Sequence, residues 1–231
     1  MNDHIIVKLD HVSFTYKDSL VNDALNDVSI QIMMGEYVAL LGPNGGGKTT
    51  LLKLISGLIK PTIGEISQRK DLKIGYVPQK STIDKTFPIT VIEAVLMGRI
   101  KKGIHPFFHY RETDKNDAIE IMTTLGIDKL KDRPISALSG GEFQKMLIGR
   151  ALIAKPEILL LDEPTASLDQ KSREEIYMLL LKLKEQGMTI ILVTHDASSI
   201  LHSIDHLVFL DQQLLFDGNP KDYNGEVHKH V

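Results

Sequence analysis

The 231 residues suffice for one large domain, or for one domain that carries an inserted subdomain. A net charge of −3 provides no basic field for nucleic acid or acidic lipid, and the absence of cysteine excludes disulfides, thiol catalysis and cysteine-ligated metals. We expect no secretory leader and, without an apolar run of about 18 residues, no membrane span, so that contact with a membrane requires a partner.

The first third of the chain has the pattern of strands. Alternating apolar and polar residues over 5–16 predict two short, half-buried antiparallel strands. Further strands are predicted over residues 28–33, 37–41, 65–67 and 73–77. A strand-rich start, followed by a strand, a loop and a helix, favours a small antiparallel sheet docked on an α/β core.

The pattern changes to helices after residue 89. Helices are predicted over residues 90–98, 113–125, 139–154, 170–186 and 196–204. Continuous aliphatic runs at 157–161 and 189–193 predict parallel strands that are buried on both faces. A hairpin is expected over 206–216 and a loose polar tail after it. We therefore predict an α/β core of residues 1–89 and 156–231, with an inserted helical subdomain over 90–155.

A glycine loop joins the strand at 37–41 to the helix that follows. It consists of Gly42, Pro43, Asn44, Gly45, Gly46, Gly47, Lys48 and Thr49, with Thr50 next in the chain. Glycines let backbone N–H groups converge on an anion, and the start of a helix adds positive charge. Lys48 supplies a cation for the β- and γ-phosphates, and the Thr49 hydroxyl can ligate Mg²⁺. A nucleoside triphosphate site is the prediction; the alternative is a simple glycine-rich turn.

Two more buried strands end in polar residues, Asp162-Glu163 and Thr194-His195. Ligands bind at the carboxyl ends of strands in open parallel sheets, so these residues should face the glycine loop. Asp162 could hold Mg²⁺ through its water shell, and Glu163 could orient or deprotonate an attacking water. His195 could contact the γ-phosphate. The alternatives are that the two carboxylates cap a helix and that the histidine is an ordinary packed or surface residue.

Two further segments could bind the nucleotide. Gln79 ends a strand before a polar loop, where its amide could share Mg²⁺ or water, although a structural role is common for such a residue. Ser139, Gly140 and Gly141 open a helix, which makes a second anion-binding N-terminus or an ordinary N-cap.

Taken together, these motifs resemble the ATP-binding cassette family, specifically the nucleotide-binding subunit of an ABC transporter. Their order and spacing match over nearly the whole chain. The matching segments are GPNGGGKTT for the Walker A loop, Gln79 for the Q-loop, LSGGE for the signature, ILLLDEP for the Walker B strand, residues 166–169 for the D-loop and 194–196 for the switch-histidine loop. Tyr16 falls where the family places an aromatic that stacks on adenine.

The resemblance implies a P-loop NTPase (RecA-like) core with an N-terminal antiparallel β-subdomain and an inserted α-helical subdomain. It implies ATP and Mg²⁺ as ligands, with Glu163, His195 and Gln79 as catalytic residues. It also implies a head-to-tail dimer, in which Ser139, Gly140 and Gly141 of one copy clamp the γ-phosphate held by the other. Glu142 departs from the commoner glutamine, and we expect its carboxylate to point away from this clamp.

Residues 86–99 look more narrowly like bacterial importers of zinc, manganese or iron. The resulting hypothesis is an ATPase subunit that couples hydrolysis to substrate import. It would lie on the cytoplasmic face of the membrane, bound to a polytopic permease that works with a substrate-binding protein, and it would not bind nucleic acid. Its surface near 86–110 would dock the permease. Four histidines are either metal ligands or, more commonly for such residues, solvated side chains: His105, His109, His228 and His230.

Two alternatives come from other functional classes. A soluble ABC mechanoenzyme acting on nucleic acid or ribosomes would need long coiled coils, a second cassette or a basic face, none of which this sequence shows. A catalytically dead ATP-binding module is disfavoured because Lys48, Asp162, Glu163 and His195 are all present.

Overall fold

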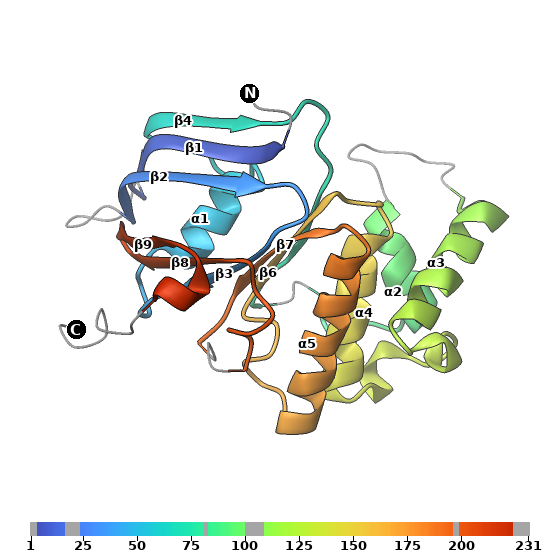
Figure 1. Ribbon diagram of the computed structural model, residues 1–231. Coiled ribbons are helices and arrows are strands. Elements are labelled where there is room, and N and C mark those ends of the chain that lie inside the picture. The colour runs from blue at the N-terminus through green and yellow to red at the C-terminus, as the bar shows by residue number, and fades with distance from the viewer. Residues whose placement is uncertain (1–3, 17–23, 81–82, 100–108, 196–198, 224–231) are drawn as a thin grey trace.

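The computed structural model describes residues 4–16, 24–80, 83–99, 109–195 and 199–223, and these residues form two sheets with helices packed on them (Figure 1). The larger sheet has the strand order β5-β6-β7-β3-β8-β9 and is parallel except for β9, which pairs antiparallel with β8. Its strands are β3 (Tyr37–Leu41), β5 (Ile74–Val77), β6 (Ile158–Asp162), β7 (Thr189–Val193), β8 (His206–Asp211) and β9 (Gln213–Gly218). The smaller sheet is antiparallel and consists of β2 (Leu25–Met33), β1 (Ile5–Phe14) and β4 (Ile63–Gln68), in that order.

The helices cover both faces of the larger sheet. The α-helices are α1 (Lys48–Ile55), α2 (Val91–Leu96), α3 (Glu112–Thr124), α4 (Gly140–Leu152) and α5 (Gln170–Glu185), and the short 3-10 helices are η1 (Met97–Arg99), η2 (Asp128–Leu130), η3 (Ile135–Ala137) and η4 (Pro220–Asp222). Helix α1 lies between the two sheets, whereas α4 and α5 cover the opposite face, with α2 and α3 beyond α4 (Figure 1).

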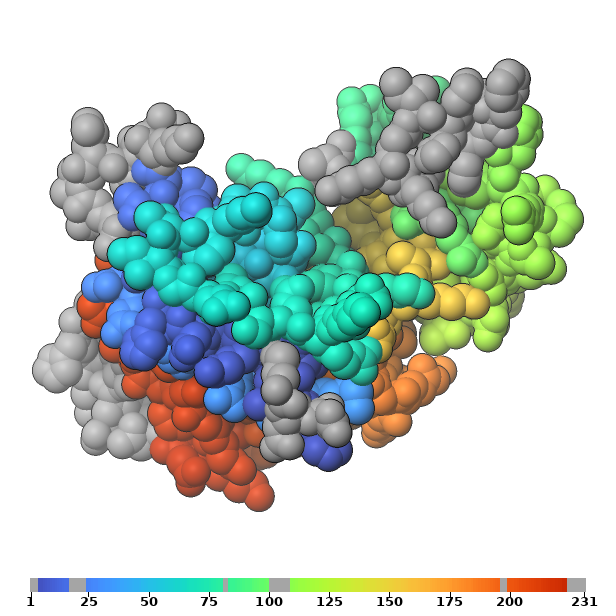
Figure 2. Space-filling model, turned by 90° about the horizontal axis from the view of Figure 1, so that it is seen from above, coloured from blue at the N-terminus to red at the C-terminus, as the bar shows by residue number. Residues whose placement is uncertain are grey.

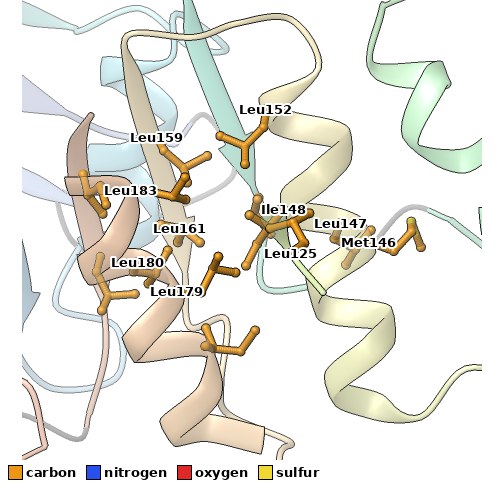
Figure 3. Packing of buried hydrophobic residues seen from close by; sticks show 14 of the residues in the cluster. Leu125, Met146, Leu147, Ile148, Leu152, Leu159, Leu161, Leu179, Leu180 and Leu183 are labelled. Carbon is orange, nitrogen blue, oxygen red and sulfur yellow. The ribbon is translucent and has the colours of Figure 1, made fainter. Parts of the chain in front are cut away.

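The central strands are buried on both faces because their alternate side chains enter two different cores. In β6, Ile158 and Leu160 join the core formed with α1 and the small sheet, whereas Leu159 and Leu161 join the core formed with α2 to α5. Figure 3 shows Leu159 and Leu161 facing the leucines of α5. This arrangement explains why these strands read as continuous aliphatic runs in the sequence.

Most of the predicted elements are confirmed, with ends that move by a few residues, and two are wrong. Residues 5–16 do not form two strands: β1 is continuous, and a register shift between Leu9 and Val12 changes its alternation. The predicted helix at 196–204 is wrong for residues 199–204: residues 199–203 form turns, in which the Ser203 N–H donates to the Ile200 carbonyl, and residue 204 has no regular structure. Serines favour such turns because their hydroxyls compete for backbone hydrogen bonds. Residues 196–198 lie outside the described part. The expected loose tail is wrong for residues 219–223, because η4 lies there and Tyr223 stacks on Phe209, and residues 224–231 lie outside the described part.

Among the residues that the structure describes, three α-helices, α2 to α4, separate β5 from β6 in the chain. Helix α4 also packs against α5 and β5, so it shares a core with the larger sheet. The division into a core of 1–89 and 156–231 and a helical subdomain of 90–155 stays a prediction. Over the described ranges, no helix is both long enough and apolar enough to cross a membrane.

His206, at the start of β8, contacts Asp217 of β9 and Glu36, which immediately precedes β3. Its Nε2 lies 2.5 Å from Asp217 Oδ1 and its Nδ1 lies 3.4 Å from Glu36 Oε2, with only 12% of the side chain exposed. The hydrogen bonds to Asp217 and then to Glu36 raise the pKa of His206 to about 9. The imidazolium is therefore the form that the folded protein stabilises.

We expect this cluster to make stability depend on pH. The pKa of His206 is higher in the folded chain than the ordinary 6.5, so its contribution is complete below about pH 6.5 and is lost as the pH rises through 9. A rise of this size corresponds to on the order of 3 kcal/mol. The free energies of unfolding of wild type and His206→Gln, measured with urea, should differ by that amount at pH 6 and become equal above pH 9.5. A difference that does not change with pH would contradict the assignment.

Candidate functional site

The glycine loop lies between β3 and the start of α1, and the end of β8 packs against it. Gly42 has a φ of 143°, and a Cβ at this position would lie 1.9 Å from the Leu210 carbonyl oxygen. Gly47, the N-cap of α1, has a φ of 90°, and a Cβ there would meet the Ala24 carbonyl oxygen at 2.4 Å. Asn44 and Gly45 are exposed at the tip of the loop. Only glycine therefore fits at both ends of this loop.

Lys48 is buried, with 6% of its surface exposed, and its ammonium group lies inside the loop. Its Nζ donates hydrogen bonds to the Gly42 carbonyl at 2.8 Å and to the Pro43 carbonyl at 2.7 Å. Burial lowers the pKa of Lys48, and the nearby charges of Glu163, Asp162 and Asp211 oppose that change. The structure thus holds a cation where the phosphates of a nucleotide are expected.

Asp162 and Thr49 form the candidate Mg²⁺ site. The Thr49 Oγ1 donates to Asp162 Oδ2 at 2.9 Å, while the buried Oδ1 of Asp162 has no hydrogen-bond partner among the described residues. Burial raises the pKa of Asp162, because the hydrogen bond from Thr49 and the nearby lysines do not fully replace the hydration that the carboxylate has lost. A hydroxyl and a carboxylate are the oxygen ligands that Mg²⁺ takes, with phosphates and waters completing its shell. The donor set therefore fits Mg²⁺.

Glu163 lies between Gln79 and His195. The Gln79 Nε2 donates to Glu163 Oε2 at 2.8 Å, and the His195 Nε2 lies 2.9 Å from Glu163 Oε1. These residues follow β5, β6 and β7, which are neighbours in the sheet, so their carboxyl ends meet at one edge. The structure thus brings together the three residues that the sequence predicts to be catalytic.

A cavity of about 300 Å³ adjoins this cluster. Its lining residues are Glu163, Thr165, Ala166, Arg173, Thr194 and His195. The hydroxyls of Thr165 and Thr194 also bond to Tyr177 of α5, a residue absent from the predicted site. Nothing in the sequence could identify Tyr177, because it occupies an ordinary apolar position of an amphipathic helix.

Tyr16 lies beside the start of α1. Its hydroxyl is 3.2 Å from Thr50 Oγ1, its ring meets Phe14 edge-on at 4.8 Å, and 39% of its surface is exposed. An aromatic face near the glycine loop is thus available to a base.

Ser139, Gly140 and Gly141 lie at the N-terminus of α4, against the N-terminus of α5. A Cβ on Gly141 would lie 2.9 Å from Ser172 Oγ and 3.0 Å from Ser172 Cβ, so a larger residue would require the Ser172 side chain or its helix to shift. Within the described ranges, no hydrogen bond joins residues 139–141 to the glycine loop. The two predicted anion sites are therefore not connected directly within one chain.

The carboxylate of Glu142 does not turn away from this helix end, contrary to expectation. It accepts a hydrogen bond from the backbone N–H of Ser139 at 2.8 Å, and the Ser139 Oγ accepts one from the Glu142 N–H at 3.3 Å. This reciprocal pair is a capping box, which satisfies two backbone donors at once. These hydrogen bonds lower the pKa of Glu142.

Known proteins are similar to this chain in sequence and in fold. A family model described as ABC transporter matches residues 25–166. The zinc import ATP-binding protein ZnuC of Pseudomonas aeruginosa (strain UCBPP-PA14) is 35% identical over 225 residues, covering 97% of this chain and 78% of that protein. ZnuC of Yersinia pestis bv. Antiqua (strain Antiqua) is 37% identical over 218 residues, covering 94% of this chain and 80% of that protein.

Solved structures support the same assignment. The ADP conformation of an ATP-binding cassette from an ABC transporter superimposes with a TM-score of 0.84 at 28% identity, covering 96% of this chain and 95% of that one. A dimeric, post-hydrolysis cassette bound to ADP and Pi superimposes with a TM-score of 0.77 at 31% identity, covering 94% and 100%.

Proposed function

Because this chain belongs to the ABC transporter family, as an ATP-binding and ATP-hydrolysing subunit, we propose that it drives the import of zinc. The observation that carries the cargo assignment is the similarity to ZnuC, at 35% identity over 97% of the chain. These relatives are transport ATPases, so the alternative of a mechanoenzyme acting on nucleic acid or ribosomes has no support among them.

In the proposed mechanism, the glycine loop binds the triphosphate of ATP. Backbone N–H groups of the non-proline residues in the glycine loop and the Lys48 ammonium bind the β- and γ-phosphates, and Tyr16 stacks on the adenine. Thr49 and Asp162 would hold Mg²⁺, together with Gln79. Bound there, Mg²⁺ would neutralise negative charge on the phosphate oxygens.

Glu163 is the proposed general base. Its carboxylate takes a proton from water as the water oxygen bonds to the γ-phosphorus and the bond from that phosphorus to ADP breaks. Gln79 and His195 each contact one carboxylate oxygen, at 2.8 and 2.9 Å, which orients Glu163 toward the water. His195, whose side chain is 48% exposed, would also contact the γ-phosphate of bound ATP.

A second copy of the chain would complete the site. Ser139, Gly140 and Gly141 lack a link to the glycine loop of their own chain within the described residues, and similar cassettes form dimers. These residues of one copy would then clamp the γ-phosphate in the other. We expect Mg²⁺ and ATP to convert a hydrolysis-deficient chain to a dimer in analytical ultracentrifugation; a persistent monomer would contradict this pairing.

A hollow beside α4, which among the described residues meets the surface near 86–110 only at Gly98, is the proposed docking site for the permease. It has a volume of about 370 Å³ and is lined by Leu58, Tyr76, Val77, Pro78, Lys80, Gly98, Leu147, Arg150 and Ala151. Figure 2 looks onto this side, where part of α4 (yellow) shows between the teal residues that include β4 and β5 and the green residues of α2 and α3. Leu58 is 61% exposed at its rim. Residues 100–108, including His105, lie outside the described part.

Docking at this hollow would hold the chain at the cytoplasmic face of the membrane as a peripheral subunit. Leu58→Glu should then release the chain from purified membranes, whereas Leu215→Glu, at a leucine on β9 that is 46% exposed, should not. Association that survives Leu58→Glu would place the docking site elsewhere.

Uptake by intact cells tests the cargo. Cells lacking this chain should lose zinc uptake, the wild-type gene should restore it, and Glu163→Gln should not. Manganese and iron uptake serve as comparisons. A defect in manganese or iron uptake with normal zinc uptake would refute zinc as the cargo while leaving the ATPase assignment intact.

A further inference from the structure

Three buried hydroxyl groups form a chain beneath the catalytic residues. The Tyr177 hydroxyl lies 3.1 Å from Thr165 Oγ1 and 3.2 Å from Thr194 Oγ1. Thr165, Thr194 and Tyr177 expose 5%, 3% and 8% of their surfaces. Water therefore has little access to these groups, and the hydrogen bonds between them replace the hydration that each has lost.

This chain connects two segments that are distant in sequence. Thr165 lies two residues after Glu163, in the turn that follows β6, whereas Thr194 immediately precedes His195 after β7. Both threonines also line the 300 Å³ cavity that Glu163 and His195 line. Tyr177 thus connects the backbone that carries the proposed base to the backbone that carries its histidine partner.

The turn after β6 needs such support. Glu163 has a φ of 49°, a left-handed conformation that costs a non-glycine residue free energy unless the surroundings hold it in place. The backbone hydrogen bond from the Glu163 N–H to the Val193 carbonyl, at 3.1 Å, holds one side of the turn. The bond between Thr165 and Tyr177 holds the other side.

Packing alone would not require the Tyr177 hydroxyl, because phenylalanine would fill the same apolar position of α5. A nearby buried tyrosine provides the contrast. The hydroxyl of Tyr37 on β3 is also buried but has no hydrogen-bond partner among the described residues. Tyr37 therefore offers the same chemical group, at a similar depth, without the connection to the two turns.

We propose that Tyr177 is a positioning residue that fixes Glu163 and His195 relative to one another through Thr165 and Thr194. This inference rests on the proposed roles of Glu163 and His195. Losing the connection should misplace the base without touching the nucleotide, and small misplacements of a catalytic group slow turnover far more than they weaken binding.

The test is steady-state ATP hydrolysis by the full chain. Tyr177→Phe should lower kcat about tenfold or more, with the KM for ATP and equilibrium ATP binding changed by less than about twofold. Tyr37→Phe, the matched loss of a buried phenol oxygen, should leave kcat unchanged. An unchanged kcat in Tyr177→Phe, or an equal fall in Tyr37→Phe, would overturn the proposal.

Thr165 provides an independent check, which also decides the matter if Tyr177→Phe fails to fold. Thr165→Val removes the hydroxyl and should reproduce the loss in kcat, whereas Thr165→Ser keeps the hydroxyl and should retain activity. The double variant Tyr177→Phe/Thr165→Val should be no slower than either single variant, because both break one connection. Additive losses, or an equal loss in Thr165→Ser, would contradict a shared connection.

Glu163→Gln in the same assay separates the role of Glu163 as the base from the role of Tyr177 as a positioning residue. If Glu163→Gln loses turnover while Tyr177→Phe does not, only the positioning role fails. If Glu163→Gln keeps turnover, the proposed base itself is wrong.

Discussion

Glu163→Gln is expected to slow ATP turnover at least about 100-fold while ATP binding persists. A positioned general base contributes about 10²- to 10⁴-fold, and a neutral amide cannot accept the proton from water. The substitution preserves shape: an amide oxygen can still accept from Gln79, and an amide N–H can still face His195, the two groups that contact Glu163 now. The loss should therefore be chemical rather than structural.

Phosphate release and equilibrium ATP titration measure the two parts of this prediction separately. Glu185→Gln, at the exposed end of α5, makes the same change of charge away from the site and should have wild-type turnover. Turnover of Glu163→Gln within twofold of wild type would reject Glu163 as the base.

Lys48→Ala is expected to weaken ATP binding at least about 100-fold, to the point where productive binding is lost. Removing one member of a buried, hydrogen-bonded pair of charges costs about 2–5 kcal/mol. Lys48 is suited to such a pair because it is 6% exposed and already held by the Gly42 and Pro43 carbonyls, so its ammonium needs little reordering to meet a phosphate.

Calorimetric titration with Mg²⁺ and ATP measures this loss directly. Lys60→Ala removes an exposed positive charge just beyond α1 and should bind ATP as wild type does. Because Lys48 also bonds to the loop that it serves, the unfolding midpoint of Lys48→Ala must be measured alongside. Retained affinity in a folded variant would refute the phosphate-binding role of the loop.

Several parts of the fold could be predicted because their signals are local. Four consecutive aliphatic residues before Asp162 marked β6 as a strand buried on both faces, which its division between two cores confirms. The glycine loop was predictable for a similar reason. Its conformation excludes a Cβ at Gly42 and Gly47, so the requirement is visible as glycine in the sequence.

The errors arose where pairing or packing decides the conformation. The register shift in β1 depends on its partners β2 and β4, so the alternation in the sequence alone suggested two strands. The residues before β8 had helical character, but the chain turns there to bring His206 to Glu36 and Asp217. The capping role of Glu142 was missed for a different reason: its carboxylate was judged only against the phosphate clamp, although Ser139 and Glu142 have the local spacing of a capping box.

The sequence by itself determined which chemical groups are present and on which strand ends and helix starts they lie: Lys48, Asp162, Glu163 and His195 among them. Only the tertiary structure decided which of these groups are in contact. Glu163 lies between Gln79 and His195 because β5, β6 and β7 are neighbours in the sheet. Tyr177 joins Thr165 to Thr194 because α5 packs across β6 and β7. The physical reason is that periodicity and propensity act over a few residues, whereas contacts across a sheet depend on the packing of segments that lie far apart in the chain.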